Sequence, residues 1–270
     1  MTVKITPSQI KRFHKKIFSY YAKNKRELVW RKTTDPYKIL LSELMLQQTQ
    51  VSRVEHYYIE WTQHWPTIHE LAKASRSEVL KMWMGLGYNN RAIRLHKAAQ
   101  VISTTYKGDV LAAMKNYTEI PGVGRYTAHA VQIFADNADM VTVDTNIRRI
   151  LLHEFSLPEE STDDELWTLA QRCLPKGESR EWHNALMDYG AQFLTAKTTG
   201  IKPKTHQSKF KGSDRQIRAQ ILRLLLKKPQ TIIALQSSLK IQEDRLYTIL
   251  SKMKRDGLVT QKSNTYKFVE

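Results

Sequence analysis

Hydrophobic positions recur with helical spacing through the first 200 residues. The segment 7–25 begins the series, with Phe13 and Ile17 on one face and Thr6 as a candidate N-cap. The apolar run 37–61 is long enough for two helices or one broken helix. Hardly any stretch alternates with the two-residue period of a strand, so the pattern predicts an all-α fold here. Further helices are predicted at 68–74, 76–83, 91–106, 147–155, 164–174 and 181–193.

The pattern changes after residue 195. Residues 195–212 are polar, basic and without periodicity, which indicates a linker. Beyond them, helical patterns and then two short strand patterns follow, an order typical of a winged helix, which is a DNA-binding variant of the helix-turn-helix. We therefore predict a core domain at 1–200, a basic linker at 201–212 and a winged-helix-like domain at 213–270. The predicted C-terminal helices are 215–227, 231–238 and 242–255, with Leu224 among the core residues, and the strands are 258–260 and 266–269.

The net charge of the chain indicates what kind of partner it binds. The 270 residues carry a formal net charge of +17, which favours association with a polyanion. Residues 201–270 hold 16 Lys and Arg against 5 Asp and Glu, so this segment contributes about +11 of the total. A charged surface that only keeps the protein in solution, or a small protein-interaction domain, is the alternative.

The single cysteine, Cys173, excludes an internal disulfide and any cysteine-ligated cluster or zinc site. We therefore expect no metal and no iron–sulfur cofactor. The N-terminus lacks the apolar run of a signal peptide, and no run of eighteen apolar residues could span a membrane. These features predict an intracellular protein of the cytoplasm or nucleoid without a membrane partner. We expect it to be a monomer.

A turn of proline and glycines interrupts the helices near the middle of the chain. Pro121-Gly122-Val123-Gly124 separates an apolar approach from a helical pattern that begins near Arg125. The segment about 113–135 thus reads as a helix, a tight hairpin and a second helix. Backbone N–H groups at a helix start favour an anion, and glycines let a phosphate come close. The simpler interpretation is a turn with no ligand.

Two carboxylates stand out by their surroundings. Glu43 interrupts an apolar helical run, 40–46, where desolvation would raise its pKa and suit it to general acid catalysis. Asp144 begins a further helical pattern about twenty residues after the glycine turn. The alternatives are a glutamate at a solvent-facing helix edge and an aspartate that serves only as an N-cap.

Four motifs follow one another in a characteristic order: LSELMLQQTQV at 41–51, GLGYNNR at 85–91, PGVGRYTAHAV at 121–131 and VDTNIRR at 143–149. Together they resemble the helix-hairpin-helix (HhH-GPD) DNA glycosylase superfamily, and the similarity covers roughly residues 8–194. The closest branch is the MutY-type adenine glycosylases. The resemblance implies a core of two helical subdomains and a monofunctional base excision repair enzyme. Its substrate would be double-stranded DNA containing adenine mispaired with 8-oxoguanine or guanine.

The resemblance also implies roles for individual residues. Glu43 would protonate the adenine leaving group, Asp144 would stabilise the oxocarbenium-like sugar, and Tyr126 and Asn146 would support this pair. Tyrosine at position 126, where bifunctional relatives carry a lysine, cannot form an imine, so base removal without strong strand cleavage is expected. Gln48 and Tyr88 would enter the duplex around the extruded base. Other expected DNA contacts are Gln47, Thr49, Arg91, Gly122, Val123, Gly124, Arg125 and Thr127.

Two departures from the family pattern leave alternatives open. The four cluster cysteines that usually follow the last core helix are absent from 192–197, and a winged helix replaces the domain that reads 8-oxoguanine. The first alternative is a glycosylase that removes thymine or uracil opposite guanine. The second, of another class, is a non-catalytic winged-helix DNA-binding protein.

Overall fold

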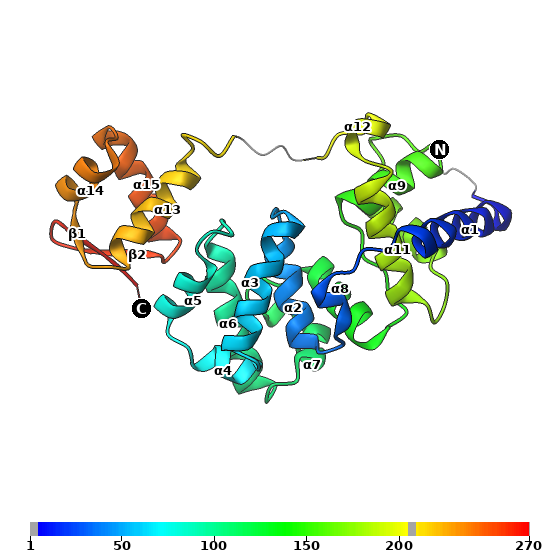
Figure 1. The fold of residues 1–270 in the computed structure, drawn as a ribbon, viewed down its shortest axis with the longest axis horizontal. Coiled ribbons are helices and arrows are strands. Elements are labelled where there is room, and N and C mark those ends of the chain that lie inside the picture. Colours follow the sequence, from blue (N-terminus) through cyan, green and yellow to red (C-terminus); the bar gives the residue numbers. More distant parts are fainter. Residues whose placement is uncertain (1–4, 205–208, 270) are drawn as a thin grey trace. The chain divides into compact units, whose positions relative to one another are not determined.

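The computed structural model describes residues 5–204 and 209–269, and they divide into two compact units that are interleaved along the chain. Unit 1 comprises Met1–Glu43 and Val110–His206, and unit 2 comprises Leu44–Asp109 and Gln207–Glu270. The ribbon in Figure 1 is coloured along the sequence, so the two segments of each unit can be followed by colour. The predicted domains 1–200, 201–212 and 213–270 stay a prediction, because each compact unit consists of two segments that are separated in the sequence.

Every element in the described residues of unit 1 is a helix. The first helix begins at a capping box, in which the Thr6 hydroxyl accepts from the Gln9 N–H and the Gln9 side chain accepts from the Thr6 N–H. The elements are α1 (Pro7–Asn24), the 3₁₀ turn η1 (Val29–Lys32), most of α2 (Pro36–Leu46), α7 (Val110–Lys115), η2 (Tyr117–Glu119), α8 (Arg125–Asp136), α9 (Thr145–Glu154), α10 (Asp163–Arg172), α11 (Ser179–Gln192) and α12 (Ala196–Thr199).

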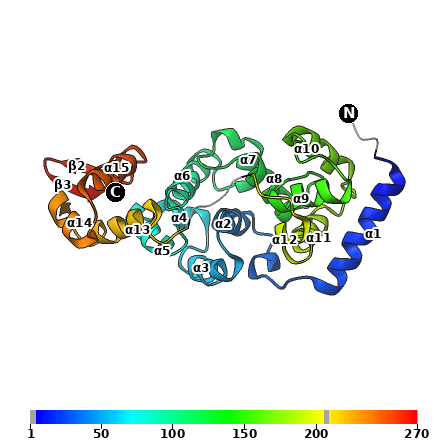
Figure 2. The same ribbon diagram turned by 90° about the horizontal axis from the view of Figure 1, so that it is seen from above.

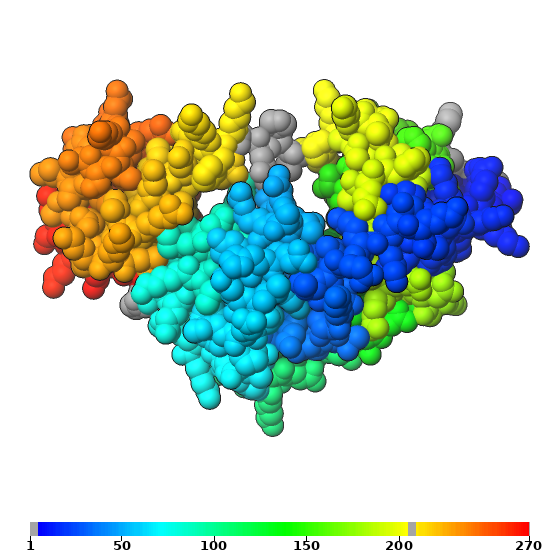
Figure 3. Space-filling view, viewed as in Figure 1, coloured from blue at the N-terminus to red at the C-terminus, as the bar shows by residue number. Residues whose placement is uncertain are grey.

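The core of unit 1 forms where α1, α9, α10 and α11 pack together. Figures 1 and 2 both show α1 alongside α11, and in Figure 3 the blue surface of α1 covers one side of this unit. Phe13 of α1 meets Trp182 of α11 edge to face at 5.3 Å between ring centroids. Trp182 and Ile17 are fully or almost fully buried. Each aromatic ring buried in this way removes about 150–250 Å² from water, so this seam is a main source of stability.

Unit 2 begins in the last turn of α2 and contains two helical clusters and a sheet. Trp61 and Trp83, both completely buried, meet edge to face at 5.6 Å. The elements are α3 (Val51–His64), α4 (Ile68–Lys73), α5 (Arg76–Trp83), α6 (Asn90–Thr105), α13 (Asp214–Leu225), β1 (Gln230–Thr231), α14 (Ile232–Leu239), α15 (Glu243–Arg255), β2 (Val259–Lys262) and β3 (Thr265–Phe268).

The C-terminal part of unit 2 has the order helix, strand, helix, helix, strand, strand. Its three strands are antiparallel with β3 in the centre, where Tyr266 pairs with Gln230 on one side and Gln261 on the other. Leu224, which the pattern assigned to the core, is only half-buried, whereas the neighbouring Leu222 is completely buried. The buried face of α13 therefore includes Ile221, Leu222 and Leu225 and leaves Leu224 at its edge.

Most predicted helices are present within two residues of their expected ends, and the apolar run 37–61 is indeed broken, at residues 47–50 between α2 and α3. Three short elements were not expected. They are η1, which lies outside every predicted helix, α12, which lies in the unpatterned stretch 195–212, and β1. In the part of the chain that the structure describes, no helix is long and apolar enough to cross a membrane.

Candidate active site

Unit 1 brings the four predicted catalytic residues together. Glu43 lies on α2, Tyr126 on α8, Asp144 caps α9, and Asn146 is in the first turn of that helix. The side chain of Tyr126 hydrogen-bonds to Glu43, and Asp144 is close enough to act electrostatically on both. Residues separated by about one hundred positions in sequence thus meet at one place.

Glu43 is buried, with 8% of its surface exposed, among the apolar residues of α2. Burial raises the pKa of its carboxyl to about 7, and the negative charge of Asp144 adds to the increase, while the hydrogen bond from Tyr126 opposes it. A carboxyl with a pKa near neutrality can donate a proton to a leaving group and take one back from water.

Asp144 sits in a different environment. Its Oδ1 accepts from the N–H of Ile147 at 2.7 Å, and its Oδ2 accepts from Nδ2 of Asn146 at 3.1 Å. Burial raises the pKa of Asp144 above its ordinary value, while these donors and the charge of Arg149 oppose the increase by favouring the ionised form. The two carboxyls therefore have different surroundings. Asp144 accepts hydrogen bonds from Ile147 and Asn146, whereas Glu43 lies among the apolar residues of α2.

Arg149, which was not predicted as a site residue, supports Asn146 through hydrogen bonds that also reach α11. It is 6% exposed, and its Nη2 donates to Oδ1 of Asn146 at 2.6 Å and to the carbonyl of Gly190 at 2.9 Å. Its Nε donates to the carbonyl of Leu194 at 2.5 Å. A Cβ on Gly190 would lie 2.8 Å from Cβ of Asn146, so α11 can approach α9 this closely only with glycine at that position.

The glycine turn lies between α7 and α8, as the pattern predicted. Gly122 has a φ of +79°, which L side chains rarely adopt, and Gly124 caps α8 in an extended conformation without a side-chain hydrogen bond. A Cβ on Gly124 would meet nothing within 4 Å, so the start of α8 is open to a ligand on that side.

The guanidinium of Arg125 lies 3.8 Å from the ring centre of Trp167. Val123 and Thr127 are buried, with 9% and 3% exposed, so both are placed to pack within the fold.

The remaining predicted DNA contacts belong to unit 2. Gln47, Gln48 and Thr49 form the turn after α2, and Tyr88 ends the turn before α6. Gln48 and Tyr88 have φ values of +55° and +48°, an unusual conformation for residues other than glycine. Such strain persists only where the surrounding structure enforces it, and it is concentrated at functional sites.

Arg91 enforces the conformation of both turns. It is 8% exposed, and its guanidinium donates to the carbonyls of Leu44 and Gln47 at 2.7 and 2.6 Å and to that of Gly87 at 3.0 Å. It also donates to Oγ1 of Thr49 at 3.0 Å. The structure thus places Arg91 inside unit 2, where it supports the turns that carry Gln48 and Tyr88, rather than on the surface expected of a DNA contact.

A second buried acid has a structural role that was not predicted. Asp188 of α11 is completely buried and accepts from Arg26 Nε at 2.6 Å and from Arg31 Nη2 and Nη1 at 2.8 Å each. Despite burial, these donors hold the pKa of Asp188 below its ordinary value. The only hint in the sequence was an acid within an apolar helical pattern, the same hint that Glu43 gives.

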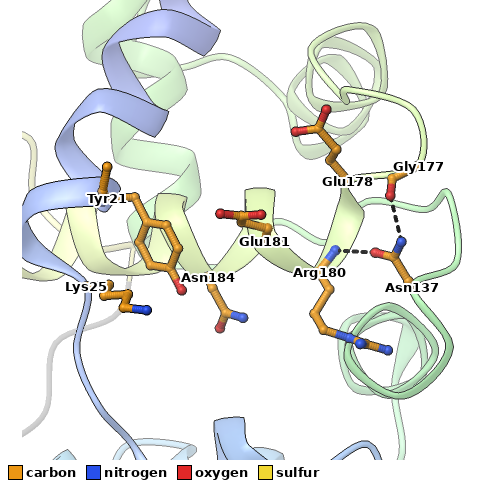
Figure 4. Close-up of a pocket in the computed structure, with 9 residues that line it drawn as sticks. Tyr21, Lys25, Asn137, Gly177, Glu178, Arg180, Glu181 and Asn184 are labelled. Atoms are coloured by element: carbon orange, nitrogen blue, oxygen red, sulfur yellow. Dashed lines mark hydrogen bonds between the residues drawn. The ribbon is translucent and has the colours of Figure 1, made fainter.

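A hollow elsewhere in unit 1 contains none of the predicted site residues. It has a volume of about 480 Å³ and lies where the end of α1 faces the start of α11. Figure 4 shows Tyr21 and Lys25 on one side with Glu181 and Asn184 next to them, and Arg180 and Asn137 on the other side, where Asn137 is bonded to the backbone of Gly177 and Arg180. Its charges are mixed, and it is separate from the carboxylate pair.

The segment after α11 provides no cysteine ligands for an iron–sulfur cluster. Leu194 is buried in the core, Thr195 caps α12, and the single cysteine, Cys173, is buried at the end of α10. Among the described residues, no three or more His, Cys, Asp and Glu side chains are grouped to hold a metal ion. The residues present therefore do not fit such a cluster.

Comparisons with known proteins identify the family of this chain. Residues 41–176 match the model of the HhH-GPD superfamily base excision DNA repair proteins. The adenine DNA glycosylase of Mycolicibacterium smegmatis is 35% identical over 91% of this chain and 92% of its own length. The human adenine DNA glycosylase is 33% identical over 70% of this chain, which spans 37% of that longer protein. The chain therefore belongs to the HhH-GPD superfamily of base excision DNA repair proteins.

Solved structures are similar as well. A thermostable thymine-DNA glycosylase is 30% identical, with a TM-score of 0.66 over 73% of this chain and 91% of that one. A trapped endonuclease III–DNA complex, 21% identical, has a TM-score of 0.64 over 74% of this chain and 92% of that one, which supports the fold alone.

Proposed function

We propose that this protein is a monofunctional DNA glycosylase that hydrolyses the N-glycosidic bond of adenine mispaired with 8-oxoguanine or guanine. The observation that carries the proposal is the pair Glu43 and Asp144. One carboxyl lies in apolar surroundings with a pKa of about 7, and the other accepts hydrogen bonds from Ile147 and Asn146. The similarity to adenine DNA glycosylases over most of the chain supports adenine as the base.

The chemistry follows from the two environments. Neutral Glu43 donates its proton to N7 of the extruded adenine, and the bond from C1′ to N9 breaks with its electron pair going to the base. The ionised Asp144 stabilises the positive charge left on the sugar. Water then attacks C1′ and loses a proton to the Glu43 carboxylate, which restores the acid for the next cycle. Tyr126, bonded to Glu43, orients the acid.

DNA is held, in this proposal, at several places. The N-terminus of α8 behind Gly122 and Gly124 binds a phosphate, and Arg125 lies beside it. Gln48 and Tyr88, presented by their strained turns, enter the duplex around the extruded base. Gln47 and Thr49 belong to the same turn. The order and the sheet of residues 213–270 support a winged-helix DNA-binding domain, attached through the linker 201–212.

Single-turnover base release tests the proposal. The substrates are duplexes with A opposite 8-oxoguanine, A opposite G, T opposite G and U opposite G, each analysed with and without alkali. We expect adenine release from the first two, with strand breaks only after alkali because position 126 is tyrosine. Similarity to a thymine-DNA glycosylase makes T or U the second candidate, and release of those bases alone would establish it. Binding without release of any base would identify the non-catalytic alternative.

A further inference from the structure

A pocket in unit 2 joins the C-terminal part of the chain to the turn that carries Tyr88. It has a volume of about 450 Å³ and lies between the turns around Gln48 and Tyr88, the start of α6, and α13. Besides the buried Arg91, its lining includes Arg94 of α6, Arg215 and Arg218 of α13, and the carboxylate of Asp256. Because its guanidinium groups outnumber its carboxylates, the pocket is positively charged.

The arginines are held in different ways. Arg218 Nη2 lies 2.5 Å from Oδ2 of Asp256, so this pair keeps the end of α15 against α13. Arg215 is placed on Tyr88 instead. Its Nη1 donates to the hydroxyl of Tyr88 at 2.8 Å, and its guanidinium carbon lies 5.3 Å from the ring centre. Arg94, one turn into α6, is exposed. The pocket therefore presents the guanidinium groups of Arg94 and Arg215 beside an aromatic ring.

The contact with Tyr88 fixes where the guanidinium of Arg215 lies. A guanidinium presents five donors in a plane, so it can keep one bond to a phenol oxygen while it binds an anion with other donors. The strained backbone of Tyr88, with φ of +48°, holds its ring at this position. Tyr88, Arg215 and Arg94 thus line one pocket, in which cationic groups and an aromatic ring are both present.

We propose that this pocket binds a DNA backbone phosphate through Arg215 and Arg94, and that Arg215 also positions Tyr88 for entry into the duplex. The C-terminal segment then takes part in binding at the lesion and is more than a separate DNA tether. This inference rests on the proposed DNA glycosylase function. It adds a phosphate site that is built jointly by 44–109 and 207–270.

DNA binding by Arg215→Ala is the first test, with Arg223→Ala as the matched control, because Arg223 is an exposed arginine on the same helix and outside the pocket. The ligand is a duplex with a tetrahydrofuran abasic analogue opposite guanine, titrated at several salt concentrations. We expect Arg215→Ala to weaken binding and to lower the slope of log K against log salt by about 1, the value for one phosphate. Arg215→Lys should restore the slope. An unchanged slope, or an equal decrease in Arg223→Ala, would overturn the phosphate site.

Base extrusion tests the positioning of Tyr88. Fluorescence of 2-aminopurine at the target position reports unstacking at saturating protein. We expect Arg215→Ala and Tyr88→Phe each to decrease this signal and the double variant to decrease it no further, because both remove the same bond. Additive decreases would contradict positioning through the hydroxyl.

Two further measurements separate the possible failures. Titration with inorganic phosphate alone should show no saturable binding below millimolar concentrations, which distinguishes a DNA phosphate from a free one. Equal urea midpoints for Arg215→Ala and the parent protein exclude a folding defect. Since the DNA titration and the fluorescence measurement read binding and unstacking, they stay interpretable even if the base removed is not adenine.

Discussion

Arg149 determines which way the amide of Asn146 faces. Its Nη2 donates to Oδ1 of Asn146 at 2.6 Å, which leaves Nδ2 of Asn146 to donate to Oδ2 of Asp144 at 3.1 Å. The same guanidinium is bonded to the carbonyls of Gly190 and Leu194 on α11 and at its end. The carboxylate proposed to stabilise the sugar cation is thus positioned through a chain of bonds that begins at the last core helix.

Replacing Arg149 with lysine is expected to slow base release while DNA binding stays nearly unchanged. Lysine keeps the charge but cannot donate along all three directions, so Asn146 loses its fixed orientation. Misplacement of a reacting group by about 1 Å can cost about 100-fold in rate. The measurement is single-turnover release at saturating enzyme. Arg148→Lys is the control, because Arg148 is also buried but bonds to the carbonyl of Glu159. Equal rates for both variants would contradict the positioning role.

Two glycines should respond differently to alanine. Gly190→Ala places a methyl 2.8 Å from Cβ of Asn146 and 3.1 Å from Cδ1 of Ile150, so α9 and α11 must separate. We expect a decrease of about 1–3 kcal/mol in the free energy of unfolding, together with slower base release. Gly124→Ala meets nothing within 4 Å and should keep its stability while DNA affinity falls. Urea unfolding and DNA titration of both variants check this, and a stable, fully active Gly190→Ala protein would refute it.

Base release should decline above neutral pH. Burial raises the pKa of Glu43 to about 7, and the reaction requires its protonated form, so the single-turnover rate should decrease about tenfold per pH unit well above that value. An acidic limb should reflect Asp144, whose raised pKa moves its ionisation above the ordinary range. Glu43→Gln should abolish release at every pH and still bind DNA. A rate that stays constant from pH 7 to pH 9 would remove Glu43 as the acid.

The same carboxyl should make stability depend on pH. The pKa of Glu43 rises from 4.5 to about 7 on folding, so its contribution is fully present below pH 4.5 and is lost as pH rises through 7. At pH 8 the decrease in the free energy of unfolding is roughly 3 kcal/mol. Glu43→Gln cannot ionise and should therefore be more stable than the parent protein at pH 8 and similar at pH 4.5. Urea unfolding at both pH values is the measurement, and a variant that is less stable at pH 8 would contradict this assignment.

Salt dependence should locate the basic residues that contact DNA. Lys252, Lys254 and Arg255 lie in the last turn of α15, in the proposed winged helix. Their combined replacement by glutamine should lower the slope of log K against log salt by about 0.9 for each phosphate that they neutralise. Lys11, Arg12 and Lys15 of α1 carry equal charge and are exposed, so their replacement is the control. Equal slopes for the two triple variants would argue against DNA binding by α15.

Periodicity predicted the long helices because their apolar faces repeat over several turns, but short elements carry too few positions. Gln230 and Thr231 form β1, and two residues cannot display an alternating pattern. The predicted helix 231–238 begins at Thr231, and the Thr231 hydroxyl accepts from the Ala234 N–H as the N-cap of α14. Features confined to one helical turn, such as this N-cap, can thus be predicted from the sequence. The pairing of β1 with β3, in contrast, depends on residues more than thirty positions apart.

The buried charged residues are the part of the candidate site whose roles could not be predicted fully from the sequence. Glu43 and Asp188 both interrupt apolar helical runs, yet Asp188 is paired with Arg26 and Arg31, and the pKa of Glu43 is governed by burial, Tyr126 and Asp144. Which partners a buried acid meets is decided by how distant segments pack. Arg91 and Arg149 present the same difficulty, because an arginine bonded to carbonyls inside a fold has no signature that separates it from one on a DNA-binding surface.

The interleaving of the two units has a consequence for synthesis on the ribosome. His14 of α1 bonds to the carbonyl of Cys173, which is translated 159 residues later. At a translation rate of about 5–20 residues per second, roughly 8–30 s pass between the synthesis of α1 and that of the helices that cover its apolar face. Residues 44–109 emerge during that interval, before either unit is complete. Nascent chains of this enzyme should therefore depend on chaperone protection of α1 more than their finished size suggests.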